Sequence, residues 1–396
     1  MTTIGELADA GVLAFGDGYR TKRSEHGAHG FRILRVGDIA DGGAVSLTGP
    51  DFVSDRYANQ IGPKAAESGD VILTTKGTVG RVAVMPETPE PIVYSPQICY
   101  FRVTDSDVLD PRFLRYWFES EAFWRQASHR MNNTDMAAYI NLADVRSLDL
   151  DLPGRSRQRA IADVLSALDD KIAANGRVAR HAESLALALA SMVRTRTTVA
   201  ALATPVRDTV SPETFADALV DHYSLPAFDS GRVPEVVEGR SIQSAKFAVT
   251  RPAVLISKLN PRIPRIWDVP AAGPRRALCS TEFVVLQPHD VSTALLWSVV
   301  SQPSVSSSIQ GMVAGTSGSH QRVRPADLIA VEIGDPATLG SGVAAKIESL
   351  VARAHGARLE RADLTELRDA LLPALMSGRL RVREAQEAVD AASGSS

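Results

Sequence analysis

The sequence predicts an α+β protein in which two copies of one mixed α/β domain are separated by two long helices that pair antiparallel. The first observation is an internal repeat. Ser95-Pro-Gln-Ile-Cys returns as Ser280-Thr-Glu-Phe-Val, and Ile140-Asn-Leu-Ala-Asp-Val returns as Val323-Arg-Pro-Ala-Asp-Leu. This period is far longer than a solenoid repeat and has the length of a domain plus a connecting helix. The second observation is that a long segment with helical spacing follows each copy. Two diverged copies of one domain, each followed by a long helix, suggest a protein that recognises two sites at a fixed distance.

The globular segments are rich in strands and turns. Gly69-Asp-Val-Ile-Leu-Thr-Thr is typical of a turn followed by a strand, and residues 77 to 84 predict a glycine-punctuated hairpin. Residues 111 to 124 carry apolar residues at helical spacing, including Trp117 and Trp124. We expect these aromatic side chains to form the core face of a helix and not a platform for stacking bases.

The first long helix is predicted over residues 157 to 193. Its apolar positions alternate in steps of four and three, which is the pattern of a seam that packs against a partner helix. Asn175 is the one polar residue in the seam, where a buried Asn can fix register. The seam consists of Ile161, Leu165, Leu168, Ile172, Asn175, Ala179, Ala182, Ala186, Leu189 and Val193.

The second long helix is predicted over residues 342 to 376, with a stop at Ser377-Gly378. Arg361 and Arg368 interrupt its seam. Neither helix can bury its seam alone, so we expect the two helices to pair antiparallel. The tail after Arg383 is predicted to be disordered. The second seam consists of Val343, Ile347, Leu350, Ala354, Ala357, Leu364, Leu371 and Leu375.

Composition restricts the class of protein. The 396 residues suit two domains, and no apolar run reaches the length of a membrane span. The N-terminus lacks the pattern of a signal peptide, and two lone cysteines are typical of a cytosolic protein without a disulfide or zinc site. The net charge is −3, yet basic residues gather between Arg240 and Arg276 and in the first half of the first copy. This predicts a basic face on each copy; the alternative is solvated loop charges.

Motifs for catalysis are missing from the sequence. Gly16-Asp-Gly does not lie between a strand and a helix, and Asn260-Pro-Arg lacks the second proline and the aromatic of a methyltransferase tetrapeptide. We find no Walker loop, metal-ligand cluster or nucleophile elbow. The sequence therefore predicts no catalytic residue, metal or cofactor in this chain.

These features together resemble the specificity subunit of type I DNA restriction-modification systems, over essentially the whole chain. Arg35-Val-Gly-Asp-Ile and Gly69-Asp-Val-Ile-Leu-Thr-Thr-Lys-Gly-Thr-Val-Gly-Arg look like the opening of that family's target recognition domain. Gln158-Arg-Ala-Ile-Ala-Asp-Val-Leu resembles the entry into its central helix, and Leu367-Arg-Asp-Ala-Leu-Leu-Pro resembles its C-terminal helix. The family usually has Glu before the Gln, where this chain has Arg157. The second copy is proline-rich at Asn260, where the first has Gly77-Thr-Val-Gly.

The resemblance implies a non-catalytic, cytoplasmic DNA reader of a bipartite target. Two modification subunits would dock on the helices, carry S-adenosylmethionine and methylate adenine; whether restriction subunits with ATP-driven translocation join them stays open. The implied domains are a first target recognition domain (1–153), a central spacer helix (154–195), a second recognition domain (196–336), a C-terminal spacer helix (337–378) and a flexible tail (379–396).

Candidate DNA-contacting residues are polar side chains in glycine-rich or basic loops, since Arg suits guanine, Asn or Gln suits adenine, and basic groups suit phosphate. They are Arg35, Lys76, Thr78, Arg81, Asn132, Asn133, Lys258, Asn260, Arg262, Arg265, Ser319, His320 and Arg322. For the helices that dock the partners, the candidate residues are Ile161, Leu165, Leu168, Ile172, Val343, Ile347, Leu350 and Leu371.

Two other classes of function stay open at this point. A coiled-coil scaffold whose globular arms bind protein or RNA would agree with the overall acidity. A stand-alone enzyme with an unrecognised site is the other alternative, and methyl transfer to DNA by the purified chain would reveal it.

Overall fold

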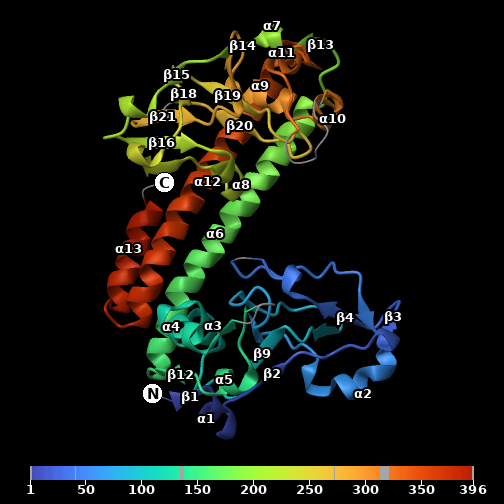
Figure 1. Cartoon of the computed structure of the whole chain (residues 1–396), viewed down its shortest axis with the longest axis vertical. Coiled ribbons are helices and arrows are strands. Elements are labelled where there is room, and N and C mark those ends of the chain that lie inside the picture. Colours follow the sequence, from blue (N-terminus) through green and yellow to red (C-terminus); the bar gives the residue numbers. More distant parts are fainter. Residues whose placement is uncertain (1, 41, 134–137, 272, 313–320, 395–396) are drawn as a thin grey trace. The chain divides into compact units, whose positions relative to one another are not determined.

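The computed structural model describes residues 2–40, 42–133, 138–271, 273–312 and 321–394 (Figure 1). The chain forms two compact units: unit 1 comprises residues 1–170 and 365–396, and unit 2 comprises residues 171–364. The division falls inside the two long helices, α6 (Arg155–Ala190) and α12 (Ser341–Met376). Each unit therefore contains one globular region and a part of each long helix.

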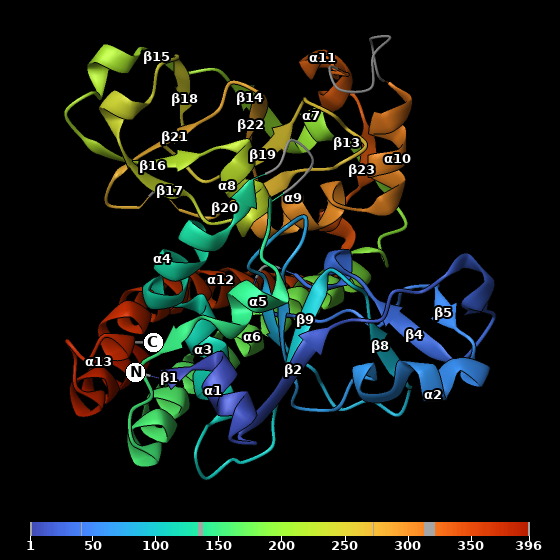
Figure 2. The same ribbon diagram turned by 60° about the horizontal axis from the view of Figure 1, so that its bottom comes forward.

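Unit 1 is built on a four-stranded antiparallel sheet with the order β2-β9-β6-β7. A second sheet, with the order β3-β5-β4-β8, contains one parallel pair, β4 and β8. Figure 2 shows β4, β5 and β8 beside the short helix α2 (Ala58–Ile61). The strands of the first sheet are Leu13–Asp17, Ile98–Val103, Val71–Thr74 and Val82–Val84; those of the second are His26–Gly27, Phe52–Val53, Phe31–Leu34 and Ile92–Tyr94.

Helix α3 (Pro111–Glu119) packs on β6 and β7, and α4 (Glu121–Arg130) follows it directly. Trp117 is buried, and its ring contacts Phe118 and Phe123, so the predicted core role of this helix is confirmed for Trp117. The remaining elements of unit 1 are α1 (Ile4–Asp9), α5 (Leu142–Arg146), the paired strands β1 (Thr2–Thr3) and β12 (Asp149–Leu150), and the paired strands β10 (Asn132–Asn133) and β11 (Ala138–Tyr139).

Unit 2 repeats this plan. Its four-stranded antiparallel sheet has the order β14-β22-β19-β20, and helix α9 (Thr293–Val300) packs on β19 and β20 as α3 packs on β6 and β7. A five-stranded sheet, β15-β18-β21-β16-β17, again contains one parallel pair, β16 and β21. The predicted repeat is therefore present in the fold. The strands of the first sheet are Ala203–Val206, Phe283–Pro288, Ala253–Ser257 and Ile266–Val269; those of the second are Thr209–Val210, Lys246–Ala248, Arg276–Cys279, Leu219–Tyr223 and Glu235–Glu238.

The shorter helices of unit 2 lie around these sheets. They are α7 (Val199–Leu202), α8 (Leu225–Ser230), α10 (Pro303–Gly311) and α11 (Pro325–Ile329), and β13 (Arg196–Thr198) pairs with β23 (Glu332–Gly334). Cys99 and Cys279 are buried free thiols. Among the described residues, no helix is long and apolar enough to span a membrane.

The two long helices pair antiparallel in each unit. In unit 1 the first half of α6 lies against the second half of α12, where Arg368 approaches Asp169. In unit 2 the second half of α6 lies against the first half of α12, and near the middle of both helices Lys171 pairs with Glu360 at 2.8 Å. The predicted fold class is confirmed, and the alternating apolar positions are the reason, because each seam requires a partner.

The packing of the seam differs between the two units. In unit 1 large side chains are buried, among them Leu165 and Leu168. In unit 2 a cluster of small residues lies between the helices, formed by Ala179, Ala182, Ala354 and Ala357. Small side chains let the helix backbones approach more closely than leucines do.

The structure differs from the prediction at the C-terminal end. Residues 379–396 were expected to be flexible, but Val382–Gly394 forms helix α13. Ala385 and Val389 lie four residues apart and are both buried, so one face of α13 packs on unit 1. This short apolar spacing is overlooked when the terminus is judged by its small and polar residues alone.

Candidate nucleic-acid interface

The turn after strand β6 positions the candidate readers of unit 1. The Thr75 carbonyl accepts a hydrogen bond from the Ile140 backbone N–H at 3.0 Å, and the Gly77 N–H donates to the Ala138 carbonyl at 3.3 Å. Between these bonds, Lys76 pairs with Tyr139 as an isolated β-bridge. The turn is therefore fastened to the segment that enters α5.

Unit 2 makes the same turn after β19. The Lys258 carbonyl accepts from the Val323 N–H at 3.0 Å, and the Asn260 N–H donates to the Gln321 carbonyl at 2.9 Å. Leu259 pairs with Arg322 between them. Each hydrogen bond of unit 1 therefore has a counterpart in unit 2, and the fold brings two proposed reader segments together in each unit.

Both turns contain a residue with a positive φ at an equivalent position, and the first turn contains a second one, Gly80, with φ +98°. Gly77 has φ +83° and Asn260 has φ +49°. Gly adopts this region without steric cost, and Asn is among the side chains that tolerate it best. The local requirement of the turn thus explains why this position is Gly in one copy and Asn in the other.

The tips of the two turns are exposed. Thr78 and Arg262 are exposed, whereas Lys76, Lys258 and Asn260 are half-buried. Asn132 and Asn133 lie in strand β10, which pairs with β11 directly beside the first turn. Ser319 and His320 lie outside the described residues.

Arg81 and Arg265 occupy equivalent positions, where the chain leaves each turn. The carbonyl of each accepts a 2.9 Å hydrogen bond, Arg81 from the Thr74 N–H and Arg265 from the Ser257 N–H. Both guanidinium groups bond within the protein. Arg81 donates to the carbonyls of Val36 (3.3 Å) and Ile39 (2.9 Å).

Arg265 forms a two-pronged ion pair with Asp229, at 2.7 and 2.8 Å, and is only 13% exposed. Hydrogen bonds from Arg265 lower the pKa of Asp229. The donors of Arg81 and Arg265 fasten each turn to its own domain, and contact of these two residues with DNA stays a prediction. Arg35, by contrast, is half exposed and pairs with the exposed Asp51 at 2.7 Å.

A basic cluster adjoins the second turn. Arg322 pairs with Glu282 at 3.1 and 2.9 Å and remains half exposed. Lys258 has a lowered pKa, chiefly because it is desolvated by burial, and the charges of Arg207 and Arg322 lower it further. Three cations near one carboxylate leave excess positive charge, which suits a phosphate group.

Sequence reasoning missed Arg207 in this cluster. Arg207 is exposed and follows strand β14 directly. Asp208 comes next in the chain, so local composition carries no basic signal here. Only the fold places Arg207 beside Lys258.

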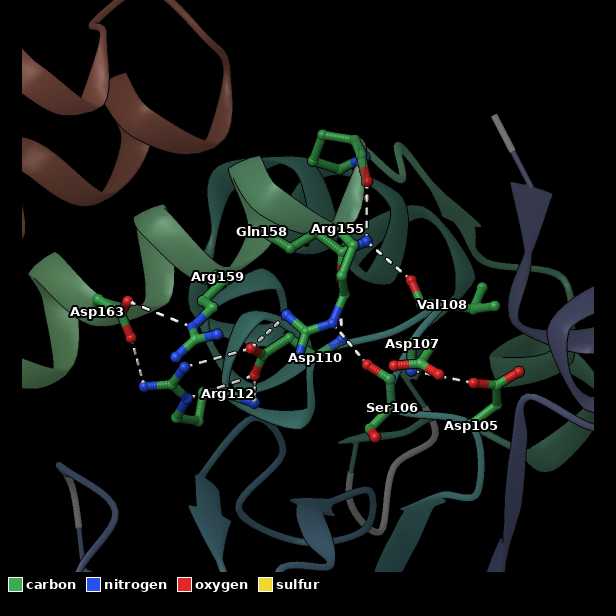
Figure 3. A network of polar contacts seen from close by, with 11 residues as sticks. Asp105, Ser106, Asp107, Val108, Asp110, Arg112, Arg155, Gln158, Arg159 and Asp163 are labelled. Atoms are coloured by element: carbon green, nitrogen blue, oxygen red, sulfur yellow. Dashed lines mark hydrogen bonds and ion pairs between the residues drawn. The ribbon is translucent and has the colours of Figure 1, made fainter.

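The first turn of α6 is fixed to the globular part of unit 1 by a polar network (Figure 3). The Gln158 side chain donates to the carbonyls of Val108 (2.9 Å) and Pro153 (2.8 Å) and accepts from the Asp110 N–H at 2.9 Å. Arg155 pairs with Asp110 at 2.7 Å. The Gln of the motif at the helix start is therefore a positioning residue.

Most residues predicted to dock partners are buried inside the chain. Ile161, Leu165, Leu168, Ile347 and Leu371 are buried, and their side chains therefore do not present a surface to another subunit. Ile172, Val343 and Leu350 are half-buried. The prediction that these buried residues dock partners is therefore corrected. Their side chains pack between α6 and α12, so a partner subunit could contact only the exposed faces of these helices.

Comparison with known proteins agrees with this architecture. Residues 3–180 match the family model described as the type I restriction modification DNA specificity domain. The type I restriction-modification S subunit from M. genitalium has the same fold, with a TM-score of 0.61 and 12% identity, covering 94% of this chain and 95% of that chain.

Two further solved structures cover almost the whole chain. The HsdS subunit from Thermoanaerobacter tengcongensis has 16% identity and a TM-score of 0.34, covering 93% of this chain and 97% of that one. A structure described by complex assembly and conformational transition of the type I R-M system has 16% identity and a TM-score of 0.39, covering 93% and 98%. No curated protein matches the chain.

The matched residues 3–180 contain the first turn, the α3 helix and the start of α6, and unit 2 repeats these elements in the same order. Residues 3–180, less than half of the chain, therefore match the type I restriction modification DNA specificity domain, and unit 2 repeats the plan of that part.

Proposed function

We propose that this chain reads a bipartite DNA target, with one half-site for each unit, and directs partner subunits to methylate adenine within it. The observation that carries the proposal is the pair of equivalent turns, 75–81 and 258–265, which share three backbone hydrogen bonds and have different exposed side chains. One shared scaffold with two different tips suits the reading of two different sequences.

Phosphate and base contacts would come from different residues. Lys258, Arg322 and Arg207 form the excess positive charge that would position the second unit on the DNA backbone. Arg262 and Thr78 are exposed at the tips and would approach base edges. Basic contacts release counterions, so binding should weaken steeply as salt concentration rises.

The partners and cofactor belong to the same proposal. Two modification subunits would bind the exposed faces of α6 and α12 and carry S-adenosylmethionine, and this chain would contribute no catalytic group. Cleavage of unmodified DNA by an added restriction subunit would use the same target reading.

Methylation mapping in the host genome, with and without this gene, tests the function. We expect methylated adenines in one split motif to disappear without the gene. Exchanging residues 78 and 79 should then alter one half of the motif, and exchanging 261–264 the other half. Arg81 and Arg265 stay unchanged in both variants, because they hold the turns in place. Retention of the whole motif after either exchange contradicts the proposal.

The helix pair provides a separate test of the spacing. Seven residues inserted in α6 near Ala182, and seven in α12 near Ala354, add two turns to each helix and keep the seam in phase. The added length of about 10 Å corresponds to roughly three base-pair steps. The gap in the methylated motif should lengthen while both half-sites stay the same; an unchanged gap with an intact complex contradicts the role of the helices as spacers.

A further inference from the structure

Unit 2 contains a cavity of about 610 Å³ between strand β20, the first turn of α9 and helix α12. Three prolines and two valines give it apolar walls: Pro252, Pro270, Pro288, Val291 and Val351. Its volume is within the range of sites that hold small organic ligands.

Asp268 is the carboxylate in the wall of this cavity. Its Oδ1 atom is buried and has no hydrogen-bond partner among the described residues. Burial raises the pKa of Asp268 to about 6, although the Thr293 side chain and the charge of Arg358 act to lower it. An unsatisfied buried carboxylate oxygen is costly, so its presence requires an explanation.

The equivalent place in unit 1 shows that the fold does not require this carboxylate. In unit 1 the strand partners run from Phe101 through Val71 to Val84. The repeat aligns them with Leu286, Val254 and Asp268 of unit 2. Val84 therefore stands where unit 2 has Asp268.

At the matching position of the helix that follows the sheet, unit 1 has a guanidinium group. Arg112 is the second residue after the N-cap Asp110 of α3, as Ala294 is the second after the N-cap Ser292 of α9. The Arg112 side chain bridges Asp110 at 3.3 Å and Asp163 of α6 at 2.8 Å (Figure 3). Ala294 carries no such group, and it lines the open cavity together with Asp268 and Glu348.

We infer that this cavity of unit 2 binds a guanidinium or amidinium group on a compact apolar body, whose N–H groups donate to the Asp268 carboxylate. The planar group supplies the paired donors that a carboxylate accepts best. The apolar walls cover the body of the ligand. The same chemistry can come from a free small molecule or from an arginine side chain of a partner polypeptide.

The charges around Asp268 agree with a cation bound at neutral pH. Burial lowers the pKa of His355, so its imidazole is neutral there and does not compete. The positive charges of Arg232 and Arg358 are opposed by Glu183, which pairs with both. Arg251 and Glu348, of opposite charge, also line the cavity. Affinity for the cation should therefore fall as the pH falls through about 6, where Asp268 takes up a proton.

Calorimetric titration of the full chain with benzamidine tests the inference, and benzamide, its uncharged isostere, is the matched probe. Wild-type protein should bind benzamidine at pH 8 at least tenfold more tightly than benzamide. Asp268→Asn should weaken benzamidine binding at least tenfold, while Asp217→Asn, at an acid 99% exposed in the same unit, should leave it unchanged. Equal affinity for the two probes, or no effect of Asp268→Asn, overturns the inference.

Ala294→Arg restores to unit 2 the guanidinium that unit 1 already has. It should abolish benzamidine binding without lowering the melting temperature; retained binding counts against the proposed position of the ligand. Circular dichroism of each variant separates lost binding from lost folding.

Titration of the complex with its partner subunits identifies the source of the cation. Persistent benzamidine binding indicates a free small molecule, and loss of binding only in the complex indicates a partner's arginine. A free chain that does not bind benzamidine contradicts both sources. Adenine methylation tests the proposed DNA reading separately, because the reader turns do not line the cavity.

Discussion

The two units share a backbone plan but differ in side chains at three matched places. The turn tip is Gly77-Thr-Val-Gly in unit 1 and the proline-rich Asn260-Pro-Arg-Ile-Pro in unit 2. The helix seam is leucine-rich in unit 1 and alanine-rich in unit 2. At the start of the helix after the sheet, Arg112 bridges Asp110 and Asp163 in unit 1, whereas Ala294 lines an open cavity in unit 2.

This comparison shows which features the fold requires and which can vary. The backbone hydrogen bonds of the turns, and the inward-bonded arginines Arg81 and Arg265, are present in both units. The exposed residues of the turns differ. The exposed residues of the turns can therefore vary while the strand pairing that supports them stays constant.

The largest expected effect concerns the helix seam. Leu165→Ala should reduce the free energy of unfolding by about 2–5 kcal/mol, because Leu165 is fully buried and the cavity left behind cannot close completely. The matched variant in unit 2 replaces a small seam residue with a large one. Ala179→Leu should cost about 1–3 kcal/mol through overpacking of the alanine cluster. Chemical denaturation measures both, and tolerance of Ala179→Leu would show that the helices are not close at this point.

The buried carboxylate gives the next effect. The pKa of Asp268 is raised to about 6 from 3.8, so folding favours its neutral form. That contribution to stability is complete below pH 3.8 and is lost as the pH rises through 6. Asp268→Val should therefore stabilise the protein by up to about 3 kcal/mol at pH 8 and by much less at pH 4.

Denaturation at the two pH values checks this prediction. The matched variant Val84→Asp in unit 1 should be less stable than wild type at pH 8. If Asp268→Val raises the free energy of unfolding equally at both pH values, burial does not disfavour the charged form of Asp268.

The turn tips give an effect on DNA binding alone. Arg262→Ala should cost about 1–3 kcal/mol of specific binding by the assembled complex, and it should relax the sequence preference of one half-site. The control is Arg265→Ala, which should lower protein stability because it leaves Asp229 without its partner. Binding to target and scrambled duplexes, measured by fluorescence anisotropy, distinguishes them; an equal loss on both duplexes would make Arg262 a phosphate contact.

The smallest effects concern the positive-φ residues. Gly77→Ala should destabilise unit 1 by about 1–2 kcal/mol, because the side chain is strained at φ +83° although no atom lies within 4 Å of the new Cβ. Asn260→Gly should be nearly neutral. Gly80→Ala should be worse than Gly77→Ala, because its Cβ would overlap the ring of Trp124. Thermal denaturation ranks the three variants.

Much of the fold could be predicted because it follows local patterns. The echo of Ser95 at Ser280 predicted the duplicated sheet, and the alternating seam from Ile161 predicted paired long helices, since both patterns survive without knowledge of distant contacts. The helix α13 was not predicted, because its burial of Ala385 and Val389 depends on a surface that other segments build.

The candidate site was predicted less completely. The sequence placed Lys76 and Lys258 in turns. It did not predict where the Arg81 and Arg265 side chains point, because their acceptors are distant in the chain. Arg81 donates to Ile39, more than 40 residues away, and Arg265 donates to Asp229 in helix α8. Arg207 was not recognised in the sequence, because the adjacent Asp208 removes any local excess of basic residues.

The sequence by itself determined the duplication, the class of each element and the requirement that the two seams meet, because periodicity and turn chemistry act over a few residues. Only the tertiary structure decided which arginines remain exposed at the tips, and that Asp268 lines an open cavity while Arg112 bridges Asp110 and Asp163. The physical reason is that hydrogen bonding and desolvation depend on neighbours that folding brings from distant parts of the chain.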